Sequence, residues 1–128
     1  MKTKDTGKVR LCSTDEGYLH AEIYADGDIT EDDIPPVTDF LDQFKAPIPA
    51  LIERKEHYSI SILVQIAMMT QTRSRLKAVA FLERNHRDVI LSRVAANTYF
   101  RDVPVKSFFE RKPALEWLKQ FCISIPQT

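Results

Sequence analysis

The densest group of side chains that could do chemistry is an acidic run near the amino terminus. Its oxygen-bearing residues alternate with others, which is the ligand spacing of a calcium-binding loop. They are Asp26, Asp28, Thr30 and Asp32. Such a loop needs glycine at its sixth position and glutamate at its twelfth, but these positions hold Glu31 and Val37. We therefore interpret the run as a turn followed by acids near a helix N-terminus, where the helix dipole favours negative charge.

The histidines and cysteines form no recognisable catalytic or metal-binding pattern. They are His20, His57, His86, Cys12 and Cys122. No two histidines have metal-ligand spacing, neither cysteine has a histidine nearby in sequence, and no G-x-S-x-G element is present. Each cysteine lies among apolar residues, which predicts a buried, unreactive thiol, and two cysteines are too few for a disulfide framework. We predict no catalytic residue and no metal ligand, and we expect that the protein is not an enzyme.

The glycines argue against a nucleotide cofactor. Gly7, Gly17 and Gly27 all lie within the first 27 residues. Dinucleotide and P-loop sites need glycine between a strand and a helix, so that backbone amides can approach phosphate. Every later strand–helix junction lacks glycine, and we therefore predict no cofactor.

Met68 and Met69 offer a candidate site of a different kind. They share a helical pattern with Ile62 and Ile66. Methionine is flexible and polarisable, so this stretch could line an adaptable apolar pocket. The alternative is that both methionines are ordinary core residues.

The elements that position these residues begin with a strand hairpin. The segments KVRLCS and GYLHAEIYADG alternate polar and apolar residues, and Asp15, Glu16 and Gly17 supply a turn between them. One face of this hairpin should be apolar. A helix is then expected at about Pro36 to Phe44, after a capping-box pattern formed by Thr30 and Asp33.

The rest of the chain alternates strands with helices. The segment PALIER predicts a strand with Leu51 and Ile52 fully buried, and a helix capped by Ser59 or Ser61 should end near Thr72. A central parallel strand is expected at residues 78–82. That helix should carry Ile62, Ile66 and Met69 on one face, with Leu63 and Ala67 beside them. Val105, Phe108 and Phe109 mark a last strand. The remaining expected inward residues are Val89, Ile90, Val94 and Ala95 of a helix after His86, and Ala114, Leu115, Leu118 and Phe121 of a closing helix with Pro113 in its first turn.

This order predicts an α/β fold: a mixed, partly parallel sheet flanked by about four helices, in the order β-β-α-β-α-β-α-β-α. The 128 residues are enough for one domain, 1–128, with a real core. Ala78 and Ala80 should lie where helices pack closely against the sheet.

The composition excludes some partners. Formal net charge is zero, so bulk charge gives no reason to expect nucleic acid. Residues 11–44 hold ten carboxylates and no Lys or Arg, while basic residues gather later. This asymmetry indicates either balance within the molecule or patches that orient a partner. No apolar run reaches the ~20 residues of a membrane span, and the polar start MKTKDTGK has no signal core, so we expect a cytoplasmic protein.

With these elements assembled, the chain resembles the STAS domains, and within them the SpoIIAA-like group, also described as STAS/SEC14-like. The stretches that carry the resemblance are YLHAEIYADGDITEDD, PALIERKEHYSIS, LKAVAFLE and VPVKSFFERKPALEWLKQF, between Val9 and Phe121. The resemblance implies a non-enzymatic, bacterial regulatory module that binds a protein partner or self-associates. SEC14-like relatives imply the alternative, a carrier or sensor of lipid or another small apolar ligand.

The resemblance also points to the start of the helix after Tyr58. Family antagonists of anti-sigma factors carry a phosphorylated serine there, and Ser59 and Ser61 are the positions onto which this role could be carried. The aspartate before that serine and the glycines after it are absent here. Capping of the helix explains Ser61 equally well.

Overall fold

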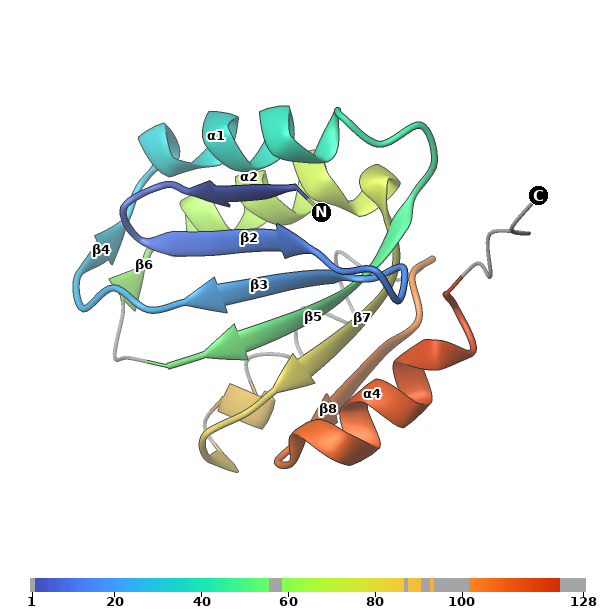
Figure 1. Cartoon of the computed structure of the whole chain (residues 1–128). Coiled ribbons are helices and arrows are strands. Elements are labelled where there is room, and N and C mark those ends of the chain that lie inside the picture. The colour runs from blue at the N-terminus through green and yellow to red at the C-terminus, as the bar shows by residue number, and fades with distance from the viewer. Residues whose placement is uncertain (1, 56–58, 87, 91–92, 94–101, 123–128) are drawn as a thin grey trace.

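The computed structural model describes residues 2–55, 59–86, 88–90, 93 and 102–122. A six-stranded sheet runs through this part of the chain in the order β1-β2-β3-β5-β7-β8 (Figure 1). The strands are β1 Thr3–Asp5, β2 Val9–Ser13, β3 Leu19–Ile23, β5 Ile48–Arg54, β7 Leu76–Leu82 and β8 Val105–Phe108. Strands β1, β2 and β3 pair antiparallel, and β3, β5, β7 and β8 pair parallel. The predicted mixed sheet is confirmed, including the hairpin and the parallel strands around Leu51, Val79 and Val105.

Helices cover both faces of the sheet. They are α1 Ile34–Leu41, α2 Ile62–Thr72 and α4 Arg111–Lys119, with single 3-10 turns at Glu31–Asp33 and Arg73–Arg75. Residues 86, 88–90 and 93, between β7 and β8, are also helical. Helices α1 and α2 lie over one face, and α4 lies on the other (Figure 1). None of the described helices is long and apolar enough to cross a membrane.

A second, two-stranded parallel sheet joins β4, Asp28–Ile29, to β6, Ser59–Ile60. Neither these strands nor β1 was predicted. Segments of two or three residues are too short to show a periodicity, and their pairing depends on segments that are distant in sequence. The β4–β6 pair ties the loop before α1 to the start of α2.

The strand β7 separates two hydrophobic clusters. Val79 and Phe81 face α1 and α2, while Ala78 and Ala80 are fully buried on the α4 side. There they belong to one cluster with Leu118 and other α4 residues. The small alanine side chains allow the helix to approach the sheet closely, so the predicted helix contact at Ala78 and Ala80 is confirmed.

The first helix is shifted relative to the prediction of Pro36 to Phe44. It begins at Ile34, because prolines are tolerated in a first turn whose N–H groups have no partner within the helix. The backbone N–H of Phe44 donates to Leu41 O at 3.2 Å, a bond of the tighter 3-10 type. The α-helical pattern therefore stops at Leu41, three residues early.

Some side chains expected inside are not fully buried: Ile90 is 61% exposed, and Ile52 is only half-buried. Leu63, expected beside the inner face of α2, is 76% exposed, and Phe109 of the predicted last strand is 55% exposed. Val64 is the buried residue of the first turn of α2, where Leu63 points outward. Phe109 follows the end of β8 and contacts His86 edge to face. Val94 and Ala95, also expected inside, are outside the described residues, as is His57.

Candidate functional site

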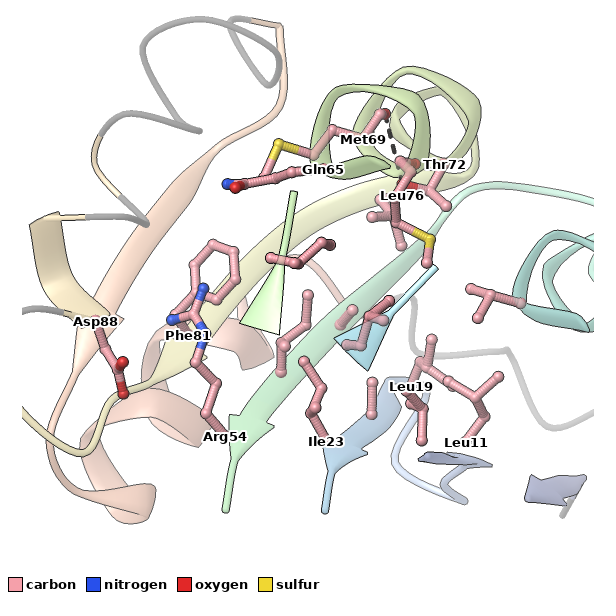
Figure 2. A pocket seen from close by; sticks show the side chains of 18 of the residues that line it. Leu11, Leu19, Ile23, Arg54, Gln65, Met69, Thr72, Leu76, Phe81 and Asp88 are labelled. Atoms are coloured by element: carbon pink, nitrogen blue, oxygen red, sulfur yellow. Dashed lines mark hydrogen bonds between the residues drawn. The ribbon is translucent and has the colours of Figure 1, made fainter. Parts of the chain in front are cut away.

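A cavity of about 680 Å³ lies between the sheet and helices α1 and α2 (Figure 2). Its floor is set by strand register. Leu19 pairs with Ala50, Ala21 with Ile52, and Ile23 with Arg54, so all of these side chains point to the same face. Because two of the paired positions hold alanine, the floor is hollow where larger side chains would fill it. Ile52 is half-buried because its side chain lines this space.

Helix α2 supplies the wall opposite the floor. Gln65, Met68, Met69 and Thr72 all line the cavity from one side of this helix. The Thr72 hydroxyl donates to the Met68 carbonyl at 2.8 Å, so its polar group is satisfied. Met68 and Met69, the pair named from sequence, are thus placed on the cavity wall, and Met69 also belongs to the buried core.

One end of the cavity is charged. Arg54 ends β5, and its Nη1 lies 2.5 Å from Glu83 Oε2. The Arg54 guanidinium also stacks over the Phe81 ring, 4.7 Å from the ring centroid. This arrangement buries a cation and an anion together, as the low-dielectric interior requires.

A second ion pair lines the same end. Arg84 Nε and Nη2 donate to the two carboxylate oxygens of Asp88 at 3.0 and 3.2 Å. Burial alone would raise the Asp88 pKa, but the hydrogen bonds from the side chain and backbone of Arg84, together with the nearby Arg54 charge, hold that pKa below its ordinary value. The carboxylate is therefore ionised at neutral pH.

The start of α2 is the second candidate region. Ser61 Oγ accepts a hydrogen bond from the Val64 N–H at 3.2 Å and so caps the helix. Ser59 lies one strand earlier, in β6, where it pairs with Asp28. Of the two serines proposed as caps, only Ser61 takes that role. Leu63, in the first turn of α2, is exposed.

The acidic run does not form a calcium loop. Asp28 belongs to strand β4, and Asp32 lies in the 3-10 turn that precedes α1. The predicted capping interaction is present, because the Thr30 N–H donates to Asp33 Oδ2 at 2.8 Å. Lys8 supplies the cation here, with its Nζ 2.8 Å from Asp33 Oδ2.

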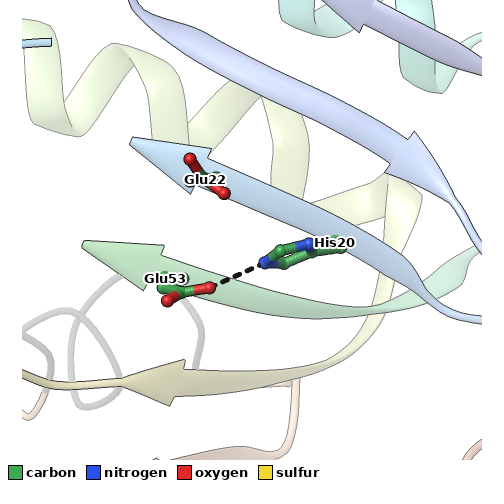
Figure 3. Close-up of side chains that lie close together, drawn as sticks. All are labelled: His20, Glu22 and Glu53. Atoms are coloured by element: carbon green, nitrogen blue, oxygen red, sulfur yellow. Dashed lines mark hydrogen bonds and ion pairs between the residues drawn. The ribbon is translucent and has the colours of Figure 1, made fainter. Parts of the chain in front are cut away.

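A cluster that sequence reasoning missed lies on the sheet face away from the cavity (Figure 3). His20 and Glu22 alternate along β3, and Glu53 stands on the neighbouring β5. His20 Nε2 is 2.9 Å from Glu53 Oε1, and one ligand atom from each residue lies within 4.8 Å of the others. Among the described residues, this is the group whose geometry could hold a metal ion.

The surroundings of that cluster already neutralise its carboxylates. Arg10 Nη1 lies 3.0 Å from Glu22, and Lys55 and Arg111 lie within 3.9 Å of Glu53. The arrangement is an ion-pair network on an open sheet surface. His20 and Glu53 are 33 residues apart, and the register of β3 with β5 brings them together.

Both cysteines are free and half-buried. Burial raises the pKa of the Cys122 thiol, which leaves it protonated and poorly nucleophilic at neutral pH. This agrees with the expected unreactive thiol at Cys122, although neither cysteine is fully buried.

Comparisons with known proteins bear on the fold. No protein-family model matches the chain, and the comparison with curated proteins found no match. The crystal structure of an uncharacterised protein of the DUF3478 family from Shewanella loihica, described as having a SpoIIAA-like fold, superimposes with a TM-score of 0.66. The match covers 86% of this chain and 91% of that one, at 22% sequence identity.

The chain has a SpoIIAA-like fold. The architecture expected from the resemblance to STAS domains is thereby confirmed. At this identity the likeness concerns the fold, and the SpoIIAA-like neighbour is itself uncharacterised. Function must be argued from the site.

Proposed function

We propose that this protein is a non-enzymatic binding module that takes a small apolar ligand into the cavity between the sheet and α2. The observation that carries the proposal is the cavity, whose volume of about 680 Å³ is that of a site for a small organic ligand. Its walls are mostly apolar, and the ion-paired Arg54, Arg84 and Asp88 lie together at one end. This is the composition of pockets that bury a ligand and fix its orientation with a few polar contacts.

The charged groups of the cavity support binding over catalysis. Arg54 is paired with Glu83, and Asp88 with Arg84. A general base or nucleophile needs a group that can approach a substrate and exchange a proton near neutral pH. An Asp88 carboxylate held by two guanidinium hydrogen bonds, with a lowered pKa, is a structural anion.

A fluorescence titration with the apolar dye Nile red tests this proposal. Ile52→Trp should place an indole ring in the cavity and raise the Kd for the dye about tenfold, a loss of about 1.4 kcal/mol, because the ring occupies space that the dye needs. The matched control is Ile90→Trp, which makes the same change on an exposed side chain that does not line the cavity. Equal loss in both variants, or no saturable binding by the wild type, would refute a cavity site.

A protein partner at the start of α2 is the second candidate function. It is favoured by the exposed Leu63, which lies in the first turn of the helix that Ser61 caps. An apolar side chain and a serine that could be phosphorylated would then share one contact surface. Self-association or binding of a regulatory protein would use this surface, and phosphorylation would add about −1.5 to −2 charges to it.

Variants at this surface separate the second candidate from the first. Leu63→Ser, Ser59→Asp and Ser61→Asp should weaken self-association or the binding of a purified partner, measured by sedimentation or calorimetry. Ile90→Ser is the matched control for the loss of an exposed apolar side chain. If the three variants bind as the wild type does, this surface is not the interface.

A further inference from the structure

We propose that the cavity selects an uncharged amphiphile: an apolar chain carrying one neutral hydrogen-bonding group, which the Gln65 side chain receives. The inference rests on the function proposed above, and names the class of ligand for the same site. Two observations carry it. One is the charge balance of the cavity, and the other is the state of the Gln65 amide.

The charges of the ionised residues that line the cavity cancel. Among the described residues they are Asp26, Arg54, Arg84 and Asp88, two of each sign. Arg54 is held by Glu83 and Arg84 by Asp88, while Asp26 is exposed. A ligand carboxylate or ammonium would enter a space without excess charge of either sign. It would have to displace a member of a buried pair or remain buried without a counter-ion, and both are costly.

Gln65 differs from the other half-buried or buried polar residues of the cavity. Its side chain is half-buried, and no described residue makes a hydrogen bond with its amide. The Thr72 hydroxyl, by contrast, donates its hydrogen bond to the Met68 carbonyl. A primary amide both donates and accepts, so it matches a hydroxyl, an amide or a protonated acid, each of which also does both.

The arrangement of the lining orients such a ligand. Figure 2 shows the Gln65 amide on the side of the cavity where Phe81 and Arg54 lie, while Leu11 and Leu19 lie toward the opposite side. The polar group of the ligand would lie under Gln65. Its chain would run over the apolar floor toward Leu11 and Leu19, where no described lining residue is charged.

Displacement of bound Nile red by decanol and by decanoate tests this preference. The two compounds have equal chain length, and at about pH 8 the decanoate is ionised whereas the alcohol is neutral. We expect decanol to displace the dye at a concentration about tenfold lower than decanoate, because burial of an unpaired charge is unfavourable. Both are used below the concentrations at which they aggregate.

Gln65→Leu tests the role of the amide. It should weaken decanol binding about three- to tenfold, which is the net value of one hydrogen bond. Circular dichroism verifies that the variant folds. Gln65→Asn retains the amide on a shorter side chain and should recover part of the loss.

The outcomes separate the two proposals. Displacement by decanoate at an equal or lower concentration would overturn the preference for an uncharged ligand and leave an apolar binding site standing. Unchanged decanol binding in Gln65→Leu would show that Gln65 does not bind the polar group of the ligand. Failure of Nile red to bind the wild type would refute the proposed function itself.

Discussion

The guanidinium of Arg54 and the carboxylate of Glu83 meet at 2.5 Å, at the carboxyl ends of the adjacent parallel strands β5 and β7. Their side chains are 6% and 0% exposed. Glu83 also accepts from the Ser107 hydroxyl at 3.4 Å, and Arg54 stacks on Phe81. The contact joins three neighbouring strands at the charged end of the cavity.

This ion pair should be costly to break from one side. Glu83→Gln leaves the Arg54 charge buried without its closest counter-ion and should lower the free energy of unfolding by ~3–5 kcal/mol. Urea denaturation measures the change. The double variant Arg54→Met with Glu83→Leu removes both charges and should recover much of the loss. A single variant as stable as the wild type would show that the pair is not buried as described.

Asp88 should make the free energy of unfolding depend on pH in the acidic range. Its pKa in the folded protein lies below the ordinary value of 3.8, so its contribution is present above that value and is lost as pH falls through the folded pKa. Asp88→Asn should therefore be less stable than the wild type by ~1.5–3 kcal/mol at neutral pH, through loss of charge-assisted hydrogen bonds. The gap between the two proteins should narrow by about pH 3 in denaturant titrations. A gap that stays constant or widens toward acid contradicts the assignment.

Ala80 should tolerate no larger side chain. It is fully buried beneath α4, in one cluster with Ala114 and Leu118. Ala80→Leu should overpack this interface and cost ~1–3 kcal/mol in chemical denaturation. Lys77→Leu, at an exposed position near the start of the same strand, is the control and should change stability by less than about 0.5 kcal/mol. Equal effects of the two changes would count against close packing at Ala80.

Ser61 should respond to substitution as a helix cap. Aspartate can accept the Val64 N–H as serine does, so Ser61→Asp should leave the melting temperature almost unchanged. Ser61→Ala loses the acceptor and should cost about 0.5–2 kcal/mol. Ser59 lies in β6, before the N-cap position, so Ser59→Ala gives the comparison. If the Ser61→Ala variant melts at the same temperature as the wild type, the Ser61 side chain does not stabilise the helix as a cap.

The strands and helices follow closely from local pattern. The alternation along Leu19–Ile23 predicted β3, and the apolar run at residues 78–82 predicted β7, because burial on one or both faces of a sheet imposes those periods. The sequence offered Ser59 and Ser61 as candidate caps. The structure selects Ser61, because α2 begins at the next residue. The exposed Leu63 was misplaced because α2 is apolar on most sides, so periodicity alone could not choose its inner face.

The site depends on register, which the sequence does not display. The hollow floor requires Ala21 and Ala50 to lie near each other on adjacent strands, although they are far apart in the chain. Arg54 and Glu83 are 29 residues apart in the chain. The sequence around each of them is typical of an ordinary charged residue on the surface. Only Met68 and Met69 gave a signal for the cavity, because two flexible apolar side chains on one helix are typical of adaptable pockets.

Methyl NMR of the protein labelled at isoleucine and methionine, titrated with decanol, is the most direct test of a ligand cavity. The account predicts saturable shifts and intermolecular NOEs at the methyl groups of Ile52, Met68 and Met69, which line the cavity. The methyl groups of Ile90, exposed and away from the lining, should be unaffected. No saturable shift at Ile52, Met68 and Met69, or NOEs confined to Ile90, would contradict it.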